Sequence, residues 1–349
     1  MRPFRLLVAA VAAASVLAPA LPAAAQTDRL PSWQLTPTGT TNQFRGLAAL
    51  SRTTAWVAGV KGTVLRTTDG GQHWLNVSPP DAAALEFRDV EASDSRHATA
   101  LAIGDGDASR IYSTSDGGAH WTRTFTNDDP KAFYDCLTFF DTRRGLALSD
   151  PVDGKFRILS TVDGGRTWKV QSTDGMPAAQ TGEFAFAASG TCLVSSGPFD
   201  AWFATGGGTA SRVFHSTDGG RRWHAVDTPI PVGATAGIYS LAFRTPWQGI
   251  AVGGDYNTPA SAPNAAAATI DGGRTWHGFT GPGEYRSGAA WVPFTRATVL
   301  AVGPTGSDVT RDGGRTWQRF DTGSFDSVEC APDGGCWASG SAGRAARLR

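Results

Sequence analysis

The stretch TTDGGQHW, Thr67–Trp74, returns in variant form along the chain and decides the fold. Five further copies follow it: TSDGGAHW, TVDGGRTW, STDGGRRW, TIDGGRTW and TRDGGRTW. Successive copies lie roughly 40 to 55 residues apart, which is the period of stacked units such as propeller blades. The repeated positions are Asp69, Asp116, Asp163, Asp218, Asp271 and Asp312, with the tryptophans Trp74, Trp121, Trp168, Trp223, Trp276 and Trp317.

The sequence between the copies predicts four short strands in each unit. A run that begins with an aromatic residue is followed by a glycine-containing run, by a third run that ends in the motif, and by a fourth that begins at the motif tryptophan. Four short strands separated by turn signals are typical of an antiparallel meander, the blade of a propeller. No helical periodicity competes with this pattern, so the chain is predicted to be all-β.

The two ends of the chain are predicted to share one further blade. After Trp317 three strand-like runs remain, SFDSVEC, CWASGS and GRAARLR, while SWQLTPTG near the start is a strand without a partner. An open ring would expose two sheet edges, and a strand supplied from the opposite terminus closes it. We therefore predict a seven-bladed β-propeller of four-stranded antiparallel blades, closed by the N-terminal strand from Trp33. Six blades are the alternative.

Each motif copy is interpreted as a structural turn between the third and fourth strands of a blade. Its aspartate should accept hydrogen bonds from backbone N–H groups of the turn, and its paired glycines supply positive φ angles. Its tryptophan should pack between blades. Six copies imply six equivalent roles, whereas catalysis needs one asymmetric site. A calcium site is a weaker interpretation, because one carboxylate per turn supplies too few oxygen ligands.

The pattern S/T-x-D-G-G-x-x-W resembles the Asp-box, or BNR repeat, of sialidases, sortilin-type receptors, xyloglucanases and the photosystem II stability/assembly factor family. The stretches VAGVKGTVLRTTDGGQHW and AVGPTGSDVTRDGGRTW are most similar to the last of these. This resemblance covers nearly the whole chain and implies a secreted, single, seven-bladed ring. It is specific for the fold and not for function, since the repeat is the fold's own structural element. Blades three to five carry longer sequences than the family pattern.

The first 25 residues have the pattern of a cleaved export signal: two arginines, an apolar run, and small residues that end at Ala25. A membrane anchor is the alternative, which Pro19 and Pro22 disfavour because they interrupt the apolar run. Residues 26–349 are then a single propeller. No later apolar run approaches the roughly 20 residues that span a bilayer, so the protein is expected to be periplasmic or secreted, without a membrane span after cleavage.

Charge and cysteine content narrow the classes of function. The 31 Lys and Arg residues balance the 31 Asp and Glu residues, so no net charge attracts the protein to nucleic acid, although a local basic patch remains open. Cys330 and Cys336 flank the turn sequence APDGG and are expected to form a disulfide across a hairpin. Cys136 and Cys192 either pair or serve as small core residues. No metal-binding spacing and no dinucleotide motif is present, so neither a metal nor a cofactor is predicted.

Candidate binding residues are expected at the channel mouth, on the face opposite the motif turns. There the first strands of the blades begin and the second strands end. Guanidinium, phenol and carboxyl groups that converge at a channel mouth can bind a ligand, because arginine grips carboxylates and phosphates with two parallel hydrogen bonds. Ion pairing between blades is the structural alternative. The candidates are Arg45, Arg88, Tyr134, Asp135, Glu183, Tyr239 and Arg286 at first-strand starts, and Asp150 and Asp255 at second-strand ends.

By resemblance, the leading hypothesis is a monomeric, exported, non-enzymatic propeller that binds a protein or peptide of the cell envelope and acts in assembly or stability. The alternative is a glycan-active enzyme, such as a sialidase-like glycoside hydrolase, or a glycan-binding lectin. Sialidases use three arginines, a tyrosine paired with a glutamate and an acidic proton donor, and the chain contains such residues without the family's F/Y-R-I-P signature. The Ala, Pro and Ser residues of the segment Thr258–Thr269 indicate a mobile excursion from blade five. A lid, a linker and a disordered loop are its three possible interpretations.

Overall fold

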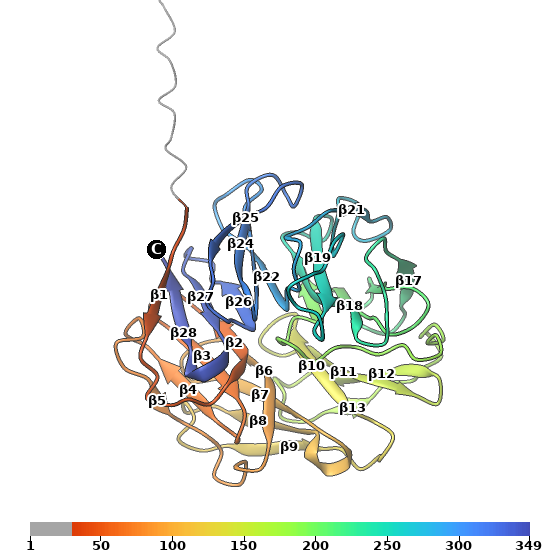
Figure 1. Ribbon diagram of the computed structural model, residues 1–349. Helices are drawn as coiled ribbons and strands as arrows, with labels where there is room; N and C mark the ends of the chain where they lie inside the picture. Colours follow the sequence, from red (N-terminus) through yellow and green to blue (C-terminus); the bar gives the residue numbers. More distant parts are fainter. Residues whose placement is uncertain (1–29) are drawn as a thin grey trace, which may run out of the picture. The chain divides into compact units, whose positions relative to one another are not determined.

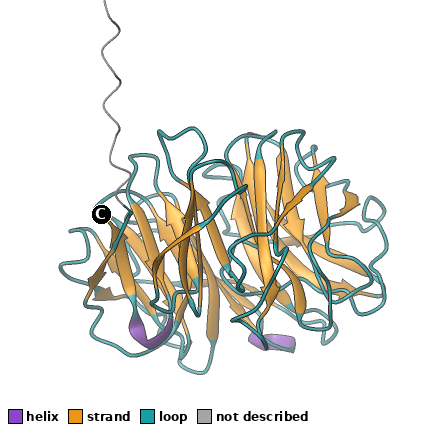
Figure 2. Cartoon of the chain, turned by 45° about the horizontal axis from the view of Figure 1, so that its top comes forward, coloured by secondary structure: helices purple, strands orange, loops and turns teal. Residues whose placement is uncertain are grey.

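The computed structural model describes residues 30–349, and the predicted export signal lies outside these residues. The described chain forms seven four-stranded antiparallel sheets arranged in a ring, which confirms the seven-bladed propeller and excludes the six-bladed alternative (Figure 1). The strands of the blades stand between two faces that the loops form (Figure 2). No helix within residues 30–349 is long and apolar enough to cross a membrane.

Blades one to six run outward from the central channel in the order of the sequence, and in blade seven the N-terminal strand is the outermost. Blade one comprises β2 (Phe44–Ala49), β3 (Ala55–Gly59), β4 (Val64–Thr67) and β5 (Leu75–Asn76), and blade two comprises β6 (Glu86–Ala92), β7 (Ala98–Ile103), β8 (Arg110–Thr114) and β9 (Thr122–Thr126). Blade three comprises β10 (Tyr134–Phe139), β11 (Gly145–Val152), β12 (Lys155–Thr161) and β13 (Lys169–Val170). Blade four comprises β14 (Leu193–Ser196), β15 (Asp200–Ala204), β16 (Arg212–Ser216) and β17 (His224–Asp227). Blade five comprises β18 (Ala236–Phe243), β19 (Gly249–Asp255), β20 (Ala266–Thr269) and β21 (His277–Phe279). Blade six comprises β22 (Gly288–Trp291), β23 (Val299–Gly303), β24 (Gly306–Thr310) and β25 (Gln318–Asp321). Blade seven comprises β26 (Ser327–Cys330), β27 (Cys336–Ser339), β28 (Ala345–Leu348) and β1 (Trp33–Thr36). Two short 3₁₀ helices, η1 (Gly106–Ala108) and η2 (Ser341–Gly343), complete the described elements.

The N-terminal strand β1 closes the ring by pairing with β28, as the sequence predicts (Figure 1). The antiparallel register joins Trp33 to Leu348 and Thr36 to Ala345. The hydroxyl of Thr36 also accepts a hydrogen bond of 3.2 Å from the indole N–H of Trp74 in the neighbouring blade. Strand β1 is therefore bonded both to β28 of its own blade and to blade one, and it covers the sheet edge at β28.

Aromatic side chains pack the spaces between blades. Trp56, Trp202 and Trp337 are fully buried. Trp121 of blade two meets Trp56 of blade one edge to face with ring centroids 6.3 Å apart, and Trp74 meets Trp337 in the same way at 5.9 Å. Edge-to-face pairs of this kind contribute roughly 0.5–1.5 kcal/mol beyond the area that they bury. The motif tryptophans thus help to hold consecutive blades together.

Every motif copy forms the same hairpin turn, here called the motif turn. At Asp163, one carboxylate oxygen accepts hydrogen bonds from the backbone N–H of Thr167 at 3.0 Å and from the hydroxyl of Thr161 at 2.8 Å. Gly164 and Gly165 have φ angles of 78° and 77°, which favour glycine at both positions. Burial opposes ionisation, but hydrogen bonds from the side chain and backbone of Thr167 outweigh it and lower the pKa of Asp163 to about 2.

The motif turns share one face of the ring with the turns that join first to second strands. In six blades the backbone N–H of the first motif glycine donates a hydrogen bond to a carbonyl of that blade's first turn, as Gly70 does to Thr53 at 2.8 Å. We call this side the motif face and the opposite side the channel-mouth face. The starts of the first strands lie on the channel-mouth face, so the turns and the candidate binding residues are on opposite faces.

Asp163→Ala should lower the free energy of unfolding by roughly 1 to 3 kcal/mol, because the Thr167 N–H and Thr161 hydroxyl lose their acceptor. Urea denaturation followed by tryptophan fluorescence measures the change. The matched control is Asp128→Ala, at an exposed aspartate in the loop after β9, where a change within about 0.5 kcal/mol is expected. Equal losses in the two variants would contradict the structural role of the motif aspartate.

Candidate functional site

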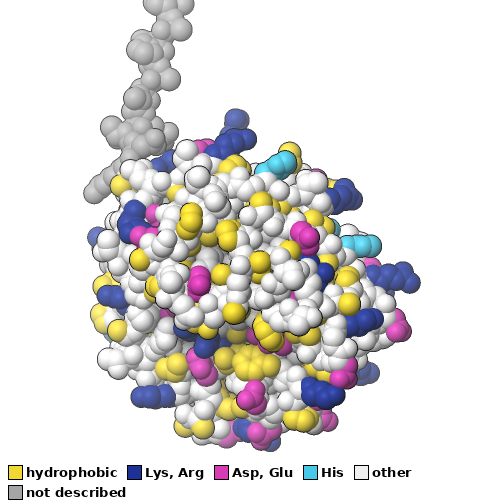
Figure 3. All heavy atoms as spheres, turned by 45° about the vertical axis from the view of Figure 1, so that its right-hand side comes forward, with side chains coloured by type: hydrophobic (Ala, Val, Ile, Leu, Met, Phe, Trp, Pro, Cys, Tyr) yellow, Lys and Arg dark blue, Asp and Glu magenta, His cyan; other side chains and the backbone are white. Residues whose placement is uncertain are grey.

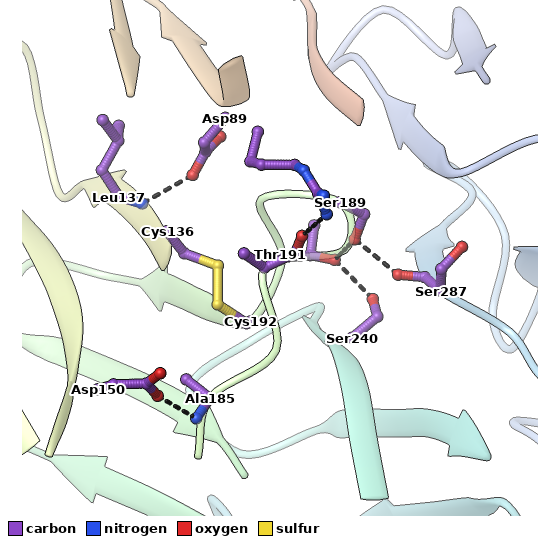
Figure 4. The surroundings of a disulfide bond; sticks show 12 residues. Asp89, Cys136, Leu137, Asp150, Ala185, Ser189, Thr191, Cys192, Ser240 and Ser287 are labelled. Atoms are coloured by element: carbon purple, nitrogen blue, oxygen red, sulfur yellow. Dashed lines mark hydrogen bonds between the residues drawn. A yellow bond between two sulfur atoms is a disulfide. The ribbon is translucent and has the colours of Figure 1, made fainter. Parts of the chain in front are cut away.

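A peptide segment of the protein's own chain fills the centre of the ring. The connection from β13 to β14 is long. Its last part, residues 186–191 with the sequence FAASGT, is here called the plug segment. Ala188, Ser189 and Gly190 are buried. The plug segment contacts residues of blades one, two, five, six and seven, and Cys192, which follows it, is bonded to blade three. It therefore lies at the centre of the ring, where Figure 4 shows Ser189 and Thr191 among strands of the surrounding blades.

Two of the candidate arginines bind the main chain of the plug segment. The Arg88 guanidinium donates a hydrogen bond to the carbonyl oxygen of Ala187, and Arg45 Nη1 donates one to the carbonyl oxygen of Ala188 at 3.4 Å. Arg45 also lies 3.7 Å from the carboxylate of Asp326. Burial, and next the neighbouring charge of Arg45, lower the pKa of Arg88. The structure therefore brings Arg45 and Arg88 together at the channel mouth.

Hydrogen bonds of hydroxyl groups hold Ser189 and Thr191 of the plug segment among the surrounding blades. Ser189 Oγ donates a hydrogen bond to the carbonyl oxygen of Ser287 at 2.6 Å, and Ser327 Oγ donates one to the carbonyl oxygen of Ser189 at 3.4 Å. The hydroxyl groups of Thr191 and Ser240 lie 2.7 Å apart. These contacts satisfy the polar groups of a buried, irregular segment, which would otherwise be costly to remove from water.

Asp89 and a disulfide fix the inner end of the plug segment. A Cβ atom at Gly190 would clash with the carboxylate of Asp89, and Gly190 has a φ of 80°, so both space and conformation favour glycine. Asp89 accepts a hydrogen bond of 2.7 Å from the backbone N–H of Leu137. The next residue after the plug segment, Cys192, forms a disulfide with Cys136 of β10 (Figure 4). The second disulfide joins Cys330 to Cys336 across the β26–β27 hairpin.

Two further candidates flank the outer end of the plug segment. Tyr239 stacks on Phe186 with ring centroids 4.3 Å apart, and its hydroxyl donates a hydrogen bond to the carbonyl oxygen of Thr235 at 2.7 Å. Asp150 accepts a hydrogen bond of 2.9 Å from the backbone N–H of Ala185. Burial raises the pKa of Asp150 to about 7, although the Ala185 N–H opposes this change.

The remaining candidates do not meet the plug segment through hydrogen bonds or ring contacts. Asp135 is buried, and the pKa of its carboxyl is raised well above the usual value by burial and then by the charge of Asp150. Tyr134 is buried against Phe125, and Asp255 accepts a hydrogen bond from the hydroxyl of Thr235 at 2.8 Å.

Two candidates are buried in ion pairs within the blades. Arg286 is fully buried and pairs with Asp308, while its Nη1 donates a hydrogen bond to the hydroxyl of Thr305 at 2.9 Å. Glu183 is buried and pairs with Arg212. The three arginines that a sialidase-like site would need are therefore not presented together, because only Arg45 and Arg88 converge.

The structure contradicts one expectation about blade four and describes the blade-five segment whose role the sequence left open. Glu183 does not start the first strand of blade four, because that strand begins at Leu193 and the apolar residues before it form the plug segment instead. The segment Thr258–Thr269 is not a free excursion. Its last residues form β20, and Ala262 donates a backbone hydrogen bond of 2.9 Å to Gly283, which ties the turn to the loop before β22.

Asp89 and the plug segment are parts of the site that the sequence did not point to. The nearest signal was the run SGTC, in which small residues precede a cysteine within an unusually long connection. Among residues 30–349, no group of three or more His, Cys, Asp or Glu side chains is arranged to hold a metal ion. Acidic and basic side chains are interspersed on the face that Figure 3 shows, so neither sign of charge dominates it.

Comparison with known proteins relates the chain to other propellers through its structure. No protein-family profile and no curated protein matches the sequence. The solved structure "YCF48 bound to D1 peptide" is similar at a TM-score of 0.66 and 17% identity, over 92% of this chain and 97% of that one. YCF48 from Cyanidioschyzon merolae is similar at a TM-score of 0.65 and 15% identity, over 91% and 98%. A GH74 enzyme of Niastella koreensis is similar at a TM-score of 0.62 and 13% identity, but this chain covers 53% of it. In fold, the chain is thus a seven-bladed propeller like YCF48, as its resemblance to the photosystem II assembly factors implies.

Proposed function

We propose that the protein is an exported, monomeric, non-enzymatic propeller that binds a protein or peptide of the cell envelope at its channel-mouth face and acts as an assembly or stability factor. One observation carries the proposal. Arg45 and Arg88 already bind an irregular peptide by its main-chain carbonyl groups, namely the plug segment of the same chain. A guanidinium group that recognises carbonyl oxygens in this way can recognise those of a partner peptide as well.

The channel-mouth face remains accessible around these arginines. The side chains of Arg45 and Arg88 are 23% and 19% exposed, and Glu86, which accepts a hydrogen bond of 2.7 Å from Arg88 Nε, is exposed to 36%. The plug segment blocks the channel itself, so a partner would lie across the mouth rather than thread through it. Support also comes from YCF48, whose structure with a bound peptide has the same fold.

Arg45→Ala with Arg88→Ala should weaken partner binding by about tenfold or more, since each guanidinium hydrogen bond contributes roughly 1.5–3 kcal/mol. The measurement is fluorescence anisotropy with the best-binding peptide from an array of envelope-protein sequences of the source organism. Arg315→Ala, at an exposed arginine on the motif face, is the matched control and should bind as the wild type does.

Circular dichroism should show the same β-sheet content in both variants, so that lost binding is not mistaken for unfolding. Unchanged affinity in the double variant would contradict the proposed site. Turnover of a fluorogenic glycoside by the purified protein, with no peptide bound from the array, would replace the proposal by the glycan-active alternative.

A further inference from the structure

The motif face carries exposed apolar side chains on three consecutive blades. The turns after the first strands of blades four, five and six each present a proline followed by an aromatic residue: Pro198–Phe199, Pro246–Trp247 and Pro293–Phe294. Phe199, Trp247 and Phe294 are 50%, 58% and 84% exposed, and Ile270 of the blade-five motif turn is 77% exposed. We call these four side chains the apolar arc. Exposed apolar side chains that gather on one face mark an interaction site.

Hydrogen bonds hold the turns of the apolar arc in place. The carbonyl oxygen of Phe199 accepts from the backbone N–H of Gly219 at 2.9 Å, and that of Trp247 accepts from Gly272 at 2.9 Å. Arg244 of the blade-five turn donates to the carbonyl oxygen of Arg296 in the blade-six turn. Each turn is therefore bonded to the motif turn of its own blade or to the neighbouring turn, and the preceding prolines restrict the backbone further.

The turns around the apolar arc carry an excess of positive charge. The ranges 197–200, 216–223, 244–248, 269–276, 292–298 and 310–317 contain seven arginines and four aspartates, and neither lysine nor glutamate. The motif aspartates direct their oxygens at turn N–H groups, as Asp218 does at the N–H of Arg222 at 2.9 Å. The arginines are Arg221, Arg222, Arg244, Arg274, Arg296, Arg311 and Arg315.

The corresponding turns of blades one and two differ in both respects. Their ranges 51–54, 67–74, 93–97 and 114–121 contain two arginines and three aspartates, and the first-strand turns SRTT and SDSRH have no large apolar residue. The apolar and positive character is thus absent from blades one and two. Blade three shares it in part, because its motif turn exposes Val162 and its ranges 140–144 and 161–168 contain three arginines and two aspartates. The net charge of the whole chain is zero, so it does not reveal this local excess of arginine.

We infer that the apolar arc docks on the surface of a bilayer that contains anionic lipid. Aromatic side chains favour the interface of a membrane, and arginines next to it are attracted to anionic headgroups. The arc stands at separate turn tips. A bilayer accepts each ring individually, whereas a protein partner would have to provide a fitted pocket for each. Docking by this face would leave the channel-mouth face, where we propose peptide binding, turned away from the membrane.

Vesicle co-sedimentation tests the inference on the full chain. Vesicles of phosphatidylcholine alone are compared with vesicles of phosphatidylcholine and phosphatidylglycerol. The wild type should bind the mixed vesicles more tightly, with an affinity that falls as salt is added. Trp247→Ala with Phe294→Ala should reduce the partition coefficient by about tenfold or more, because both rings lose their transfer into the interface. Phe184→Ala, at an exposed aromatic residue outside the motif face, is the matched control and should bind normally.

Charge reversal provides an independent variant. Arg221→Glu with Arg315→Glu should abolish the preference for phosphatidylglycerol, whereas Arg96→Glu in the blade-two turn should leave it intact. Failure of the wild type to bind mixed vesicles, or equal binding by wild type and the Trp247 and Phe294 double variant, would overturn the inference. Retention on polyglutamate resin that depends on Trp247, without vesicle binding, would assign the arc to an acidic protein instead. None of these results depends on the peptide site, since the variants expected to change vesicle binding lie on the opposite face.

Discussion

The Asp89→Asn protein should be more stable than the wild type at about pH 8, by about 4 kcal/mol, and equally stable near pH 4. Asp89 is buried beside the plug segment, and burial raises its pKa to about 7, with a further contribution from the charge of Glu329 that the N–H of Leu137 opposes. Asparagine keeps an oxygen that can accept the Leu137 hydrogen bond while removing the buried charge.

The direction in which stability changes with pH follows from the number of protons that the folded and the unfolded protein bind. Between about pH 4 and pH 7 the folded protein keeps the Asp89 proton that the unfolded chain has lost, so the stability of the wild type falls as pH rises through this window. Glu329, whose pKa burial also raises to about 7, adds to the same fall. The motif aspartates act in the opposite direction, because hydrogen bonds lower their pKa values, and their contribution is lost as pH falls toward about 2.

Urea titrations at a series of pH values check this prediction, with the fluorescence of the tryptophans as the signal. The curve of stability against pH should be flatter in Asp89→Asn than in the wild type above pH 5 or so, and should coincide with it at lower pH. Asp128→Asn, at an exposed position, is the control and should follow the wild-type curve throughout. Parallel curves for Asp89→Asn and the wild type would show that Asp89 ionises normally in the folded state.

The sequence predicted the fold because the information is local and repeated. Each motif turn needs its aspartate, two glycines and tryptophan within eight residues, and six copies fix the length of the blade. Even the closing strand at Trp33 was predictable, since three strands after Trp317 lacked a fourth. Turn chemistry and strand counting do not depend on knowing which residues meet across the ring.

The candidate site was predicted only in part, because its residues meet through a segment that has no repeat. Arg45 and Arg88 occupy regular first-strand positions and were found for that reason. The sequence FAFA resembles a strand, so Glu183 before it was placed at a strand start, whereas tertiary contacts put these residues into the channel. Arg286 could not be distinguished from Arg45, because only the structure shows that Asp308 buries and neutralises it.

Cys192→Ala should lower the free energy of unfolding by about 4 kcal/mol, and Cys336→Ala by about 2 kcal/mol, in the chain-entropy description of disulfides. The difference has a simple cause. The Cys136–Cys192 bridge closes a loop with a sequence separation of 56, whereas the Cys330–Cys336 bridge has a separation of 6, so the first restricts the unfolded chain more strongly. Urea denaturation of the two variants under non-reducing conditions measures both losses, and reduction of the wild type should reproduce their sum approximately.

The Cys136–Cys192 bridge also bears on the proposed function, because it ends the plug segment that Arg45 and Arg88 hold. Without the bridge, the hydroxyl groups of Ser189 and Thr191 and the fit of Gly190 against Asp89 still bind the segment. Cys192→Ala should therefore increase hydrogen exchange at residues 186–191 more than at the blade strands, as mass spectrometry can measure. Uniformly faster exchange would mean that the bridge stabilises the whole ring and not the plug segment in particular. Unchanged exchange at these residues would show that the polar contacts alone are sufficient to keep the channel closed.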